Sequence, residues 1–456
     1  MNTITTINPA TNQPLSTWPR MGDTQARAAV EQAARTWQTW RRVPLAERAP
    51  PLLRCAALLR ERKEALADLM AREMGKPVRQ GIAEAEKCAW VCEYYAAQAE
   101  GFLAPEPVKT EAQKSYVAFE PLGVILAIMP WNFPLWQFFR FAAPTLMAGN
   151  TVVLKHAMNT TGSSLAIGEL IRDAGYPEGA VVPVIIDHRQ IEALIRHPAI
   201  RGVTLTGSTR AGQAVGAAAG AALKRSVLEL GGSDPYVILA DADIAAAAEL
   251  CATSRLINSG QSCIAAKRFI VVETVRKDFE EALLAALKKR VLGDPLDKAT
   301  DVGPQARADL RDELHEQVRK SIAAGARALL GGENPSGPGS FYPVTLLTGV
   351  RKGMPAFDEE LFGPVAAVIA ARDERDAIDL ANDSVFGLGA AVFTRDLARG
   401  EAIARHELQA GCCFVNDFVK SDPRLPFGGI LESGYGRELG RAGLLEFVNI
   451  KSIVVK

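Results

Sequence analysis

The stretch "GVTLTGSTRAGQAVGAAAG", residues 202–220, joins a strand-like run to a helix-like run through Gly207, Ser208 and Thr209. The apolar run before Gly207 predicts a buried strand, and the small residues after Thr209 predict a helix. Free backbone N–H groups at the start of such a helix can hold a pyrophosphate. A tight turn with close helix packing has the same composition, so this stretch alone does not identify a nucleotide site.

The alternation of strand and helix continues on both sides of this stretch. From residue 121, the runs "GVILAIMP", "TVVLKHA" and "AVVPVII" predict strands separated by helices. After residue 231 the pattern begins again with "RFIVVE", "VAAVIAA" and "LGAAVFT". The expected fold class is therefore α/β, with parallel strands and crossover helices in two successive domains.

Three further segments carry structural predictions. Residues 21–104 have apolar residues at helical spacing and predict a helical lead-in. The segment "GCCFVND", residues 411–417, predicts a buried strand. The segment "EFVNIKSIVVK", residues 446–456, alternates like a strand without a partner nearby, so we expect it to add to a sheet of another subunit. An ordinary edge strand is the alternative.

Composition excludes several classes of protein. The chain has 456 residues, and its 52 basic residues balance its 52 acidic residues. This balance argues against a nucleic-acid partner and against a polybasic membrane surface. The apolar runs are shorter than the about 18 to 20 residues of a membrane helix, and the polar start lacks a signal-peptide core. We expect a cytoplasmic protein whose partners are small molecules and copies of itself.

The cysteines point to one candidate nucleophile. Seven scattered cysteines argue against a disulfide framework, and we expect no metal site because C-x-x-C pairs with histidine partners are absent. Cys55 and Cys251 lie among aliphatic residues and should be buried. Cys263 lies in "NSGQSCIAAKR", residues 258–268, among small polar residues that should leave it open to approach. A chance free thiol in a loop remains the alternative.

Two other polar residues occupy unusual sequence positions. Glu229 in "SVLELGGSDP" ends a strand between two leucines, so we expect a raised pKa and general-base character. Asn132 in "IMPWNFPLWQFFR" lies among aromatic residues before a helix, where its amide could stabilise an oxyanion. The alternatives are a salt-bridged structural glutamate and a helix-capping asparagine.

The order of these motifs resembles the aldehyde dehydrogenase superfamily from about residue 7 onwards. The matching segments are "PWNFP", "TLTGSTRAG", "LELGG", "GQSC", "EELFGPV", "NDSVFGLGAAVFT", "LPFGG" and "SGYGREL". The resemblance implies two doubly wound, Rossmann-like domains and a small β oligomerisation element. It places the cofactor-binding domain at 1–105 and 121–230, the catalytic domain at 231–415, and the oligomerisation strands at 106–120 and 440–456. It also implies a homodimer or homotetramer.

The resemblance assigns the catalytic roles. Cys263 matches the nucleophile that attacks an aldehyde, Asn132 matches the oxyanion stabiliser, and Glu229 matches the base that hydrolyses the thioester. The cofactor is NAD or NADP. The residues that match its contacts are Trp131, Lys155, Gly207, Ser208, Leu230, Glu360 and Phe362.

Two departures from the family pattern concern the cofactor and a proton relay. Met158 stands where NAD-specific members carry a glutamate that binds the ribose 2′-hydroxyl, so NADP becomes possible. Phe141 stands where many members carry a lysine that relays protons to the equivalent of Glu438. The choice of cofactor and the relay therefore remain open.

The segment "WNFPLWQFFR" resembles the succinate-semialdehyde dehydrogenases. There, Arg140 and Ser421 match residues that bind the substrate carboxylate, whereas Ile257 replaces a second arginine of some members. The expected reaction is oxidation of succinate semialdehyde to succinate. The alternatives are a general aldehyde dehydrogenase, a catalytically silent relative and a thioesterase.

Overall fold

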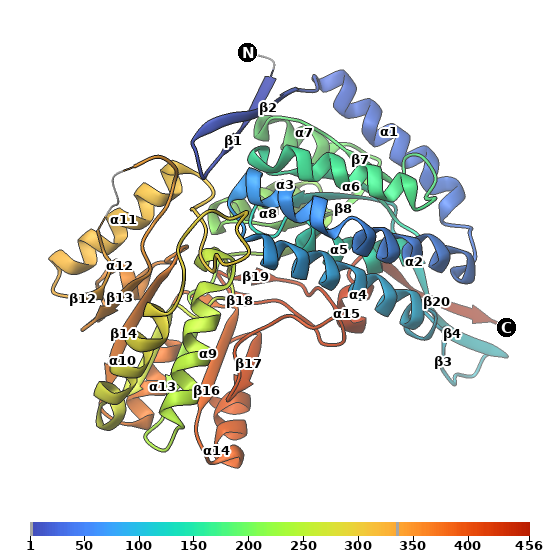
Figure 1. Cartoon of the computed structure of the whole chain (residues 1–456). Helices are drawn as coiled ribbons and strands as arrows, with labels where there is room; N and C mark the ends of the chain where they lie inside the picture. Colours follow the sequence, from blue (N-terminus) through green and yellow to red (C-terminus); the bar gives the residue numbers. More distant parts are fainter. Residues whose placement is uncertain (1–2, 334–336) are drawn as a thin grey trace.

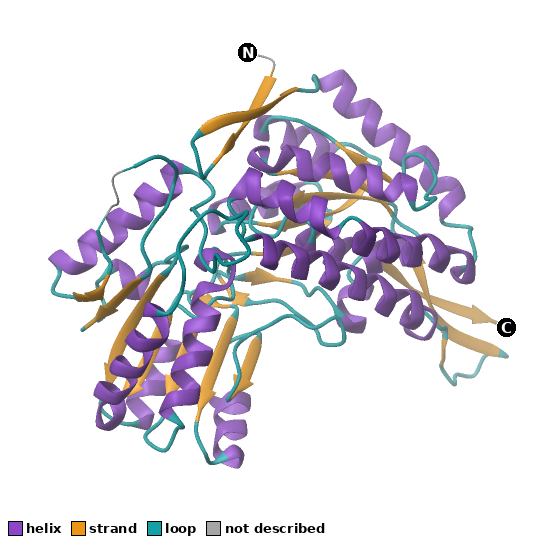
Figure 2. Ribbon diagram, in the orientation of Figure 1, coloured by secondary structure: helices purple, strands orange, loops and turns teal. Residues whose placement is uncertain are grey.

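The protein is described by a computed structural model that covers residues 3–333 and 337–456. Residues 1–2 and 334–336, which fall within the predicted domains, lie outside the described part. Figure 1 shows two lobes side by side, with the N-terminal half of the chain in one and most of the C-terminal half in the other. Figure 2 shows that loops fill much of the region where the lobes meet.

The first lobe is built on a sheet with the strand order β19-β9-β8-β5-β6-β7. All of its neighbouring pairs are parallel except β19 with β9. Strand β8 and the following helix α8 form the predicted strand–turn–helix unit. The strands are β5 Val124–Met129, β6 Thr151–His156, β7 Val181–Pro183, β8 Ile200–Thr206, β9 Arg225–Glu229 and β19 Gly434–Tyr435.

Helices cover both faces of this sheet, as parallel strands require. The helical lead-in predicted for residues 21–104 is confirmed. Sequence analysis did not predict the hairpin of β1 and β2 that precedes it. The elements are β1 Thr3–Asn8, β2 Gln13–Pro19, α1 Asp23–Trp40, α2 Leu45–Glu61, α3 Lys63–Met74, α4 Val78–Phe102, α5 Trp136–Met147, α6 Thr161–Asp173, α7 Ile191–Arg196 and α8 Thr209–Ala221.

The second lobe is built on a sheet with the order β12-β13-β14-β11-β10-β16-β17. Its pairs are parallel except β12 with β13. Its strands are β10 Pro235–Ile238, β11 Arg268–Val272, β12 Arg327–Leu330, β13 Thr345–Thr348, β14 Val365–Ala371, β16 Gly389–Phe393 and β17 Cys412–Val415. Its helices are α9 Ile244–Leu256, α10 Glu273–Lys288, α11 Ala308–Ala323, α12 Pro355–Asp358, α13 Glu374–Asn382 and α14 Leu397–Ala402.

One prediction in this lobe is wrong in its burial. The "GCCFVND" segment does form a strand, but β17 is only half-buried along its length. The reason is topological, because β17 is an edge strand with one neighbour, β16. An apolar run does not reveal whether both edges of a strand are covered.

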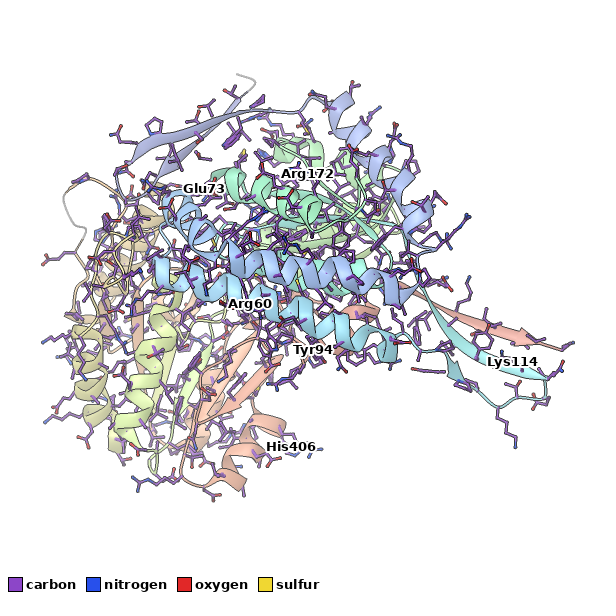
Figure 3. All side chains as sticks on the ribbon, turned by 45° about the vertical axis from the view of Figure 1, so that its right-hand side comes forward. Arg60, Glu73, Tyr94, Lys114, Arg172 and His406 are labelled. Carbon is purple, nitrogen blue, oxygen red and sulfur yellow. The ribbon has the colours of Figure 1, made fainter. Side chains whose placement is uncertain are left out.

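The third sheet forms an arm that extends from the first lobe (Figure 1). It has the order β20-β4-β3, with β3 Glu106–Pro107, β4 Lys114–Pro121 and β20 Val448–Val455. Lys114 lies on this arm, away from the main body (Figure 3). The C-terminal strand has no partner nearby in sequence, as expected, but it does have one in its own chain and lies at the edge of this sheet. β20 pairs antiparallel with β4 over its whole length, a partner more than 300 residues away in sequence.

Three short elements follow late in the chain, and α15 packs on α4 and α5 of the first lobe. They are β15 Phe386–Gly387, β18 Ile430–Leu431 and α15 Gly440–Leu445. Strand β18 pairs with β15, and nearby β19 completes the first sheet, so residues 430–435 touch both halves. Across the described ranges, every helix is too short or too polar to cross a membrane.

Candidate active site

Two cavities meet at Cys263. The α4–α5 cavity, of about 580 Å³, is lined by helices α4 and α5, by residues 253–265 and by the loop around Ser421. The α8 cavity, of about 420 Å³, lies at the start of helix α8 and is lined by residues of both lobes. Cys263 lines both cavities. A molecule in either cavity would therefore reach the same sulfur atom.

The loop that carries Cys263 differs from its predicted environment. Asn258, Ser259 and Gly260 all have left-handed backbone angles, with φ of 55°, 57° and 76°. The five polar residues before Cys263 are buried, although the sequence suggested that they could bury nothing. They are satisfied by hydrogen bonds instead. The N–H of Gly303 donates to Ser259 Oγ at 2.8 Å, and that of Ala306 donates to Gln261 Oε1 at 2.8 Å.

Burial controls the protonation of Cys263 itself. Loss of hydration raises the pKa of the thiol to about 12, and the positive charges of Lys267 and Arg140 oppose this rise. The Lys267 ammonium donates to the carbonyl oxygens of Ser262 and Cys263 at 2.9 and 2.7 Å. The resting group at neutral pH is the thiol, so attack on a carbonyl requires a proton acceptor. Cys55 and Cys251 are fully buried, as predicted.

Asn132 is buried beside the nucleophile loop. Its side-chain Nδ2 donates to the backbone carbonyl of Gln261 at 3.2 Å. The backbone carbonyl of Asn132 accepts from Asn258 Nδ2 at 2.7 Å. It does not cap a helix, because α5 begins four residues later and is preceded by Leu135. Asn132 also lines the α8 cavity next to Cys263. One amide hydrogen remains available for an oxygen bound there.

Glu229 is buried at the end of β9, and neither carboxylate oxygen has a hydrogen-bond partner in the described chain. Burial raises its pKa well above the usual range, and the nearby charge of Glu438 adds to this effect. The predicted direction of the pKa shift is confirmed. Glu229 is not a lining residue of either cavity. A Cβ atom at Gly428 would lie 2.6 Å from Glu229 Oε1, so the carboxylate packs against that glycine.

Arg140 points into the molecule from α5 and lines the α4–α5 cavity together with Cys263 and Ser421. It does not pair with a surface carboxylate. Its Nε forms an ion pair with buried Glu438, and its guanidinium lies 4.7 Å from the centre of the Phe427 ring. Its Nη2 has no hydrogen-bond partner among the described residues. The cavity thus contains the predicted arginine and serine, with the arginine paired to Glu438.

Phe141, the next residue on α5, is part of the core. Its ring packs edge-on against Phe447, with centroids 5.6 Å apart. Its ring has no ionisable proton, so Phe141 cannot relay a proton to Glu438. Arg140 contacts Glu438 instead, one position earlier on the helix. Ile257, where some relatives of the resembled group carry a second arginine, lines the same cavity as an apolar residue.

Six of the seven predicted cofactor residues lie together. The residues that line the α8 cavity or pack directly beneath it are Trp131, Gly207, Ser208, Leu230, Glu360 and Phe362. Ser208 begins α8, and its Oγ accepts from the N–H of Ala211 at 3.3 Å. The Trp131 and Phe362 rings meet edge to face at 5.6 Å. An open helix start flanked by aromatic rings suits a dinucleotide.

Glycines make room for the groups that line the α8 cavity. A Cβ at Gly231 would lie 2.5 Å from Glu360 Oε2, and one at Gly212 would lie 2.4 Å from Leu230. The other Glu360 oxygen accepts from the N–H of Gly232 at 3.0 Å. Lys267 lies 3.4 Å from the same carboxylate. Glu360 is thereby held at the cavity wall in one position.

Lys155, the seventh predicted residue, lines a different cavity of about 850 Å³ next to the β1–β2 hairpin. Met158 and Asn159 line this hairpin cavity too, and Met158 is partly exposed. Residues 306–309 at the start of α11 line the hairpin cavity, whereas Leu310 and Glu313 on the next turns line the α8 cavity. The two cavities therefore follow one another along α11.

Lys87 was not among the predicted site residues. It lies on α4, lines the α4–α5 cavity, and donates from Nζ to Ser421 Oγ at 2.8 Å. A signal was present, because Lys87 lies three residues after buried Glu84 and four before buried Val91. Those spacings place it on the inward face of the helix.

Comparison with known proteins agrees with this geometry. A family model described as "Aldehyde dehydrogenase family" matches residues 1–453. The chain belongs to the aldehyde dehydrogenase family. The predicted family and fold class are thus confirmed.

Curated relatives and a solved structure refine this comparison. The chain is 47% identical over 450 residues to a probable succinate-semialdehyde dehydrogenase [NADP(+)] of Synechocystis sp., covering 99% of both chains. It is 46% identical to a succinate semialdehyde dehydrogenase [NAD(P)+] of Escherichia coli, covering 98% of this chain and 96% of that one. The crystal structure of the Streptococcus pyogenes succinic semialdehyde dehydrogenase in complex with NADP+ superimposes with a TM-score of 0.96 at 37% identity. It covers 99% of each chain.

Proposed function

We propose that this aldehyde dehydrogenase oxidises succinate semialdehyde to succinate, with NAD or NADP as the electron acceptor. The observation that carries the proposal is the position of Cys263 between two cavities. One cavity begins at a helix N-terminus and suits a dinucleotide, and the other contains Arg140 and Ser421. The names of the relatives from Synechocystis and Escherichia coli support the same substrate.

Residues of the α8 cavity fit a nicotinamide cofactor. Gly207 and Ser208 expose the start of α8 for the phosphates, and Glu360 and Phe362 line the same cavity as Cys263. When bound there, the nicotinamide ring supplies an acceptor for hydride. Trp131 and Phe362 would exclude water from that ring because their side chains form a common wall.

Cys263 acts first, as the nucleophile. The thiol gives its proton to a base, the sulfur bonds to the aldehyde carbon, and the carbonyl π electrons move to the oxygen, which takes the negative charge. The Asn132 amide and the Cys263 backbone N–H are the groups that would stabilise this oxygen. After oxidation, Cys263 holds the acyl group as a thioester.

Glu229 acts second, as the base for hydrolysis. It takes a proton from water as the water oxygen attacks the thioester carbonyl, and the carbon–sulfur bond then breaks to release the carboxylate and the thiolate. Burial raises the pKa of Glu229, so the ionised carboxylate is a stronger proton acceptor than an exposed one. Because Glu229 lines neither cavity, its side chain must turn toward Cys263 for this step.

NADP is an acceptable cofactor in this proposal. Met158 lies in the hairpin cavity with Lys155 and provides no negative charge to repel a 2′-phosphate. The Asn159 Nδ2 group is buried there without a hydrogen-bond partner in the described chain and could donate to an anion. The Streptococcus pyogenes relative was solved with NADP+.

A panel of aldehydes assayed with NAD and with NADP tests the proposed function. We expect succinate semialdehyde to give the highest kcat/KM, ahead of the uncharged four-carbon aldehyde butanal, with both cofactors active. Equal values for the two aldehydes would reduce the function to a general aldehyde dehydrogenase.

The assembly is a separate proposal. The outer edge of β20 has no neighbouring strand in the described chain, and Ile450, Val454 and Val455 are exposed on it. This supports a homodimer or homotetramer joined along that strand. Light scattering of the wild type and of an Ile450→Lys, Val454→Lys variant tests it, because the variant should dissociate to a smaller species.

A further inference from the structure

The α4–α5 cavity contains a second, half-buried cation besides Arg140. Lys87 extends from α4, donates to Ser421 Oγ at 2.8 Å, and places its Nζ 4.3 Å from the centre of the Trp136 ring. Within residues 3–333 and 337–456, no carboxylate lies at ion-pair distance from this ammonium group. A cation partly removed from water and bonded only to a hydroxyl and a ring is costly unless an anion joins it.

The acidic residues nearest to Lys87 already have partners. Glu84 accepts from the backbone N–H groups of Leu135 and Trp136, each at 2.9 Å, and forms an ion pair with Lys76. Asp422 binds Arg424 at 2.6 Å. Neither acid can turn to Lys87 without leaving another cation or the start of α5 unsatisfied.

Arg140 is in a different state. Its Nε is paired with Glu438, so Arg140 offers a ligand its free Nη2 hydrogen bonds with a carboxylate already beside its guanidinium. Among the cations that line the cavity, Lys87 is the one without a carboxylate at ion-pair distance in the described chain. Because Ser421 is already hydrogen-bonded to it, the ammonium and the hydroxyl form a ready pair of donors.

We infer that Lys87, together with Ser421, binds the carboxylate of the substrate and determines the preference for an aldehyde with an anionic far end. This inference rests on the proposed function, and it adds a specificity residue that differs from the predicted arginine. Arg140 then acts as a hydrogen-bond donor beside the pair.

The protonation of Lys87 supports this role. Burial and, next, the charge of Arg140 lower its pKa to about 8, against the opposing charges of Cys88, Glu84 and Asp422. Below pH 8 the ammonium form is present and can bind a carboxylate. As the pH rises through 8, Lys87 loses its proton and the free enzyme loses affinity for an anionic substrate.

The main test is Lys87→Met, assayed with succinate semialdehyde and with butanal. We expect KM for succinate semialdehyde to rise by about 10- to 100-fold, as for the loss of a charged hydrogen bond. The KM for butanal should change little, because butanal has no carboxylate. Lys87→Arg should restore most of the affinity for succinate semialdehyde.

Two further variants keep the test decisive. Ser421→Ala removes the partner hydroxyl without changing charge, and we expect a smaller rise in KM for the same substrate alone. Arg79→Met removes a cation from the same cavity, but that cation already binds Asp301 at 2.9 Å. Its effect on KM should be much smaller than that of Lys87→Met.

The pH dependence gives an independent test. The ratio of kcat/KM for succinate semialdehyde to that for butanal cancels the titration of Cys263, which both substrates need. In the wild type this ratio should fall above about pH 8, whereas in Lys87→Arg it should stay flat over the same range. A flat ratio in the wild type would overturn the inference.

The outcomes separate the inference from the function on which it rests. Equal losses for both aldehydes in Lys87→Met would make Lys87 structural and leave the proposed function intact. A wild type without preference for succinate semialdehyde would overturn the proposed function and the inference together.

Discussion

The two cavities that meet at Cys263 differ in the groups that form them: mainly backbone in one and mainly long side chains in the other. The α8 cavity depends on backbone, namely the start of α8, the glycines at 207 and 231 and the N–H that holds Glu360. The α4–α5 cavity depends on long side chains from separate elements, with Lys87 from α4 and Arg140 from α5 meeting Ser421 from a distant loop. Backbone sites carry the chemistry that the family shares, and side chains decide which aldehyde enters.

The largest effect should come from the residue that belongs to both cavities. Cys263→Ala should reduce oxidation to less than about one-thousandth of the wild-type rate, because the covalent step is lost. Cofactor binding, followed by quenching of tryptophan fluorescence, should persist because the α8 cavity is unchanged. Substantial turnover by this variant would remove Cys263 from its role.

Glu229→Gln should produce the next largest effect. Steady-state turnover should fall by about 10²- to 10⁴-fold, the usual contribution of a general base. A rapid burst of reduced cofactor should remain in stopped-flow absorbance, because hydride transfer precedes hydrolysis. Loss of the burst would instead assign Glu229 to deprotonation of the Cys263 thiol.

Arg140→Met should affect stability more than a ligand contact would. It leaves buried Glu438 without its cation, which typically costs about 3–5 kcal/mol of unfolding free energy. Adding Glu438→Gln should recover part of that loss, as measured by urea unfolding of the two single variants and the double variant. Strictly additive losses would show that the pair does not interact.

The smallest effect concerns Met158 and the choice between NAD and NADP, which differ by the 2′-phosphate on the ribose. Met158→Glu should shift the NADP/NAD ratio of kcat/KM toward NAD by about 5- to 10-fold, the effect of one partly exposed charge. Met158→Gln, which has a similar size without the charge, is the control and should shift it less. A wild type that is strictly NAD-dependent would refute the reasoning from Met158.

Sequence patterns predicted the backbone-based parts of the molecule well. The strand, glycine turn and helix at 202–220 are local, so their residues are adjacent in sequence as well as in space. The partner of β20 could not be predicted from local sequence, because β4 lies more than 300 residues away. The same reason hid the ion pair of Arg140 with Glu438, which forms only when α5 meets the C-terminal segment.

The burial of polar residues could not be predicted from the sequence either. The residues from Asn258 to Ser262 looked like an open loop, yet they are buried because hydrogen bonds from other segments satisfy them. Lys87 was overlooked for a similar reason, since a lysine in a helix is usually exposed. Hydrogen-bond satisfaction depends on tertiary contacts, and no local pattern reports it.

Mass spectrometry of a trapped intermediate tests most directly the claim that both cavities serve the sulfur of Cys263. The Glu229→Gln variant would be mixed with succinate semialdehyde and NADP, quenched in acid within the burst and digested. We expect one succinyl group on the peptide that contains Cys263, and none when NADP is omitted or when Cys263→Ala is added. A succinyl group on another residue, or an unmodified Cys263 peptide after a full burst, would contradict it.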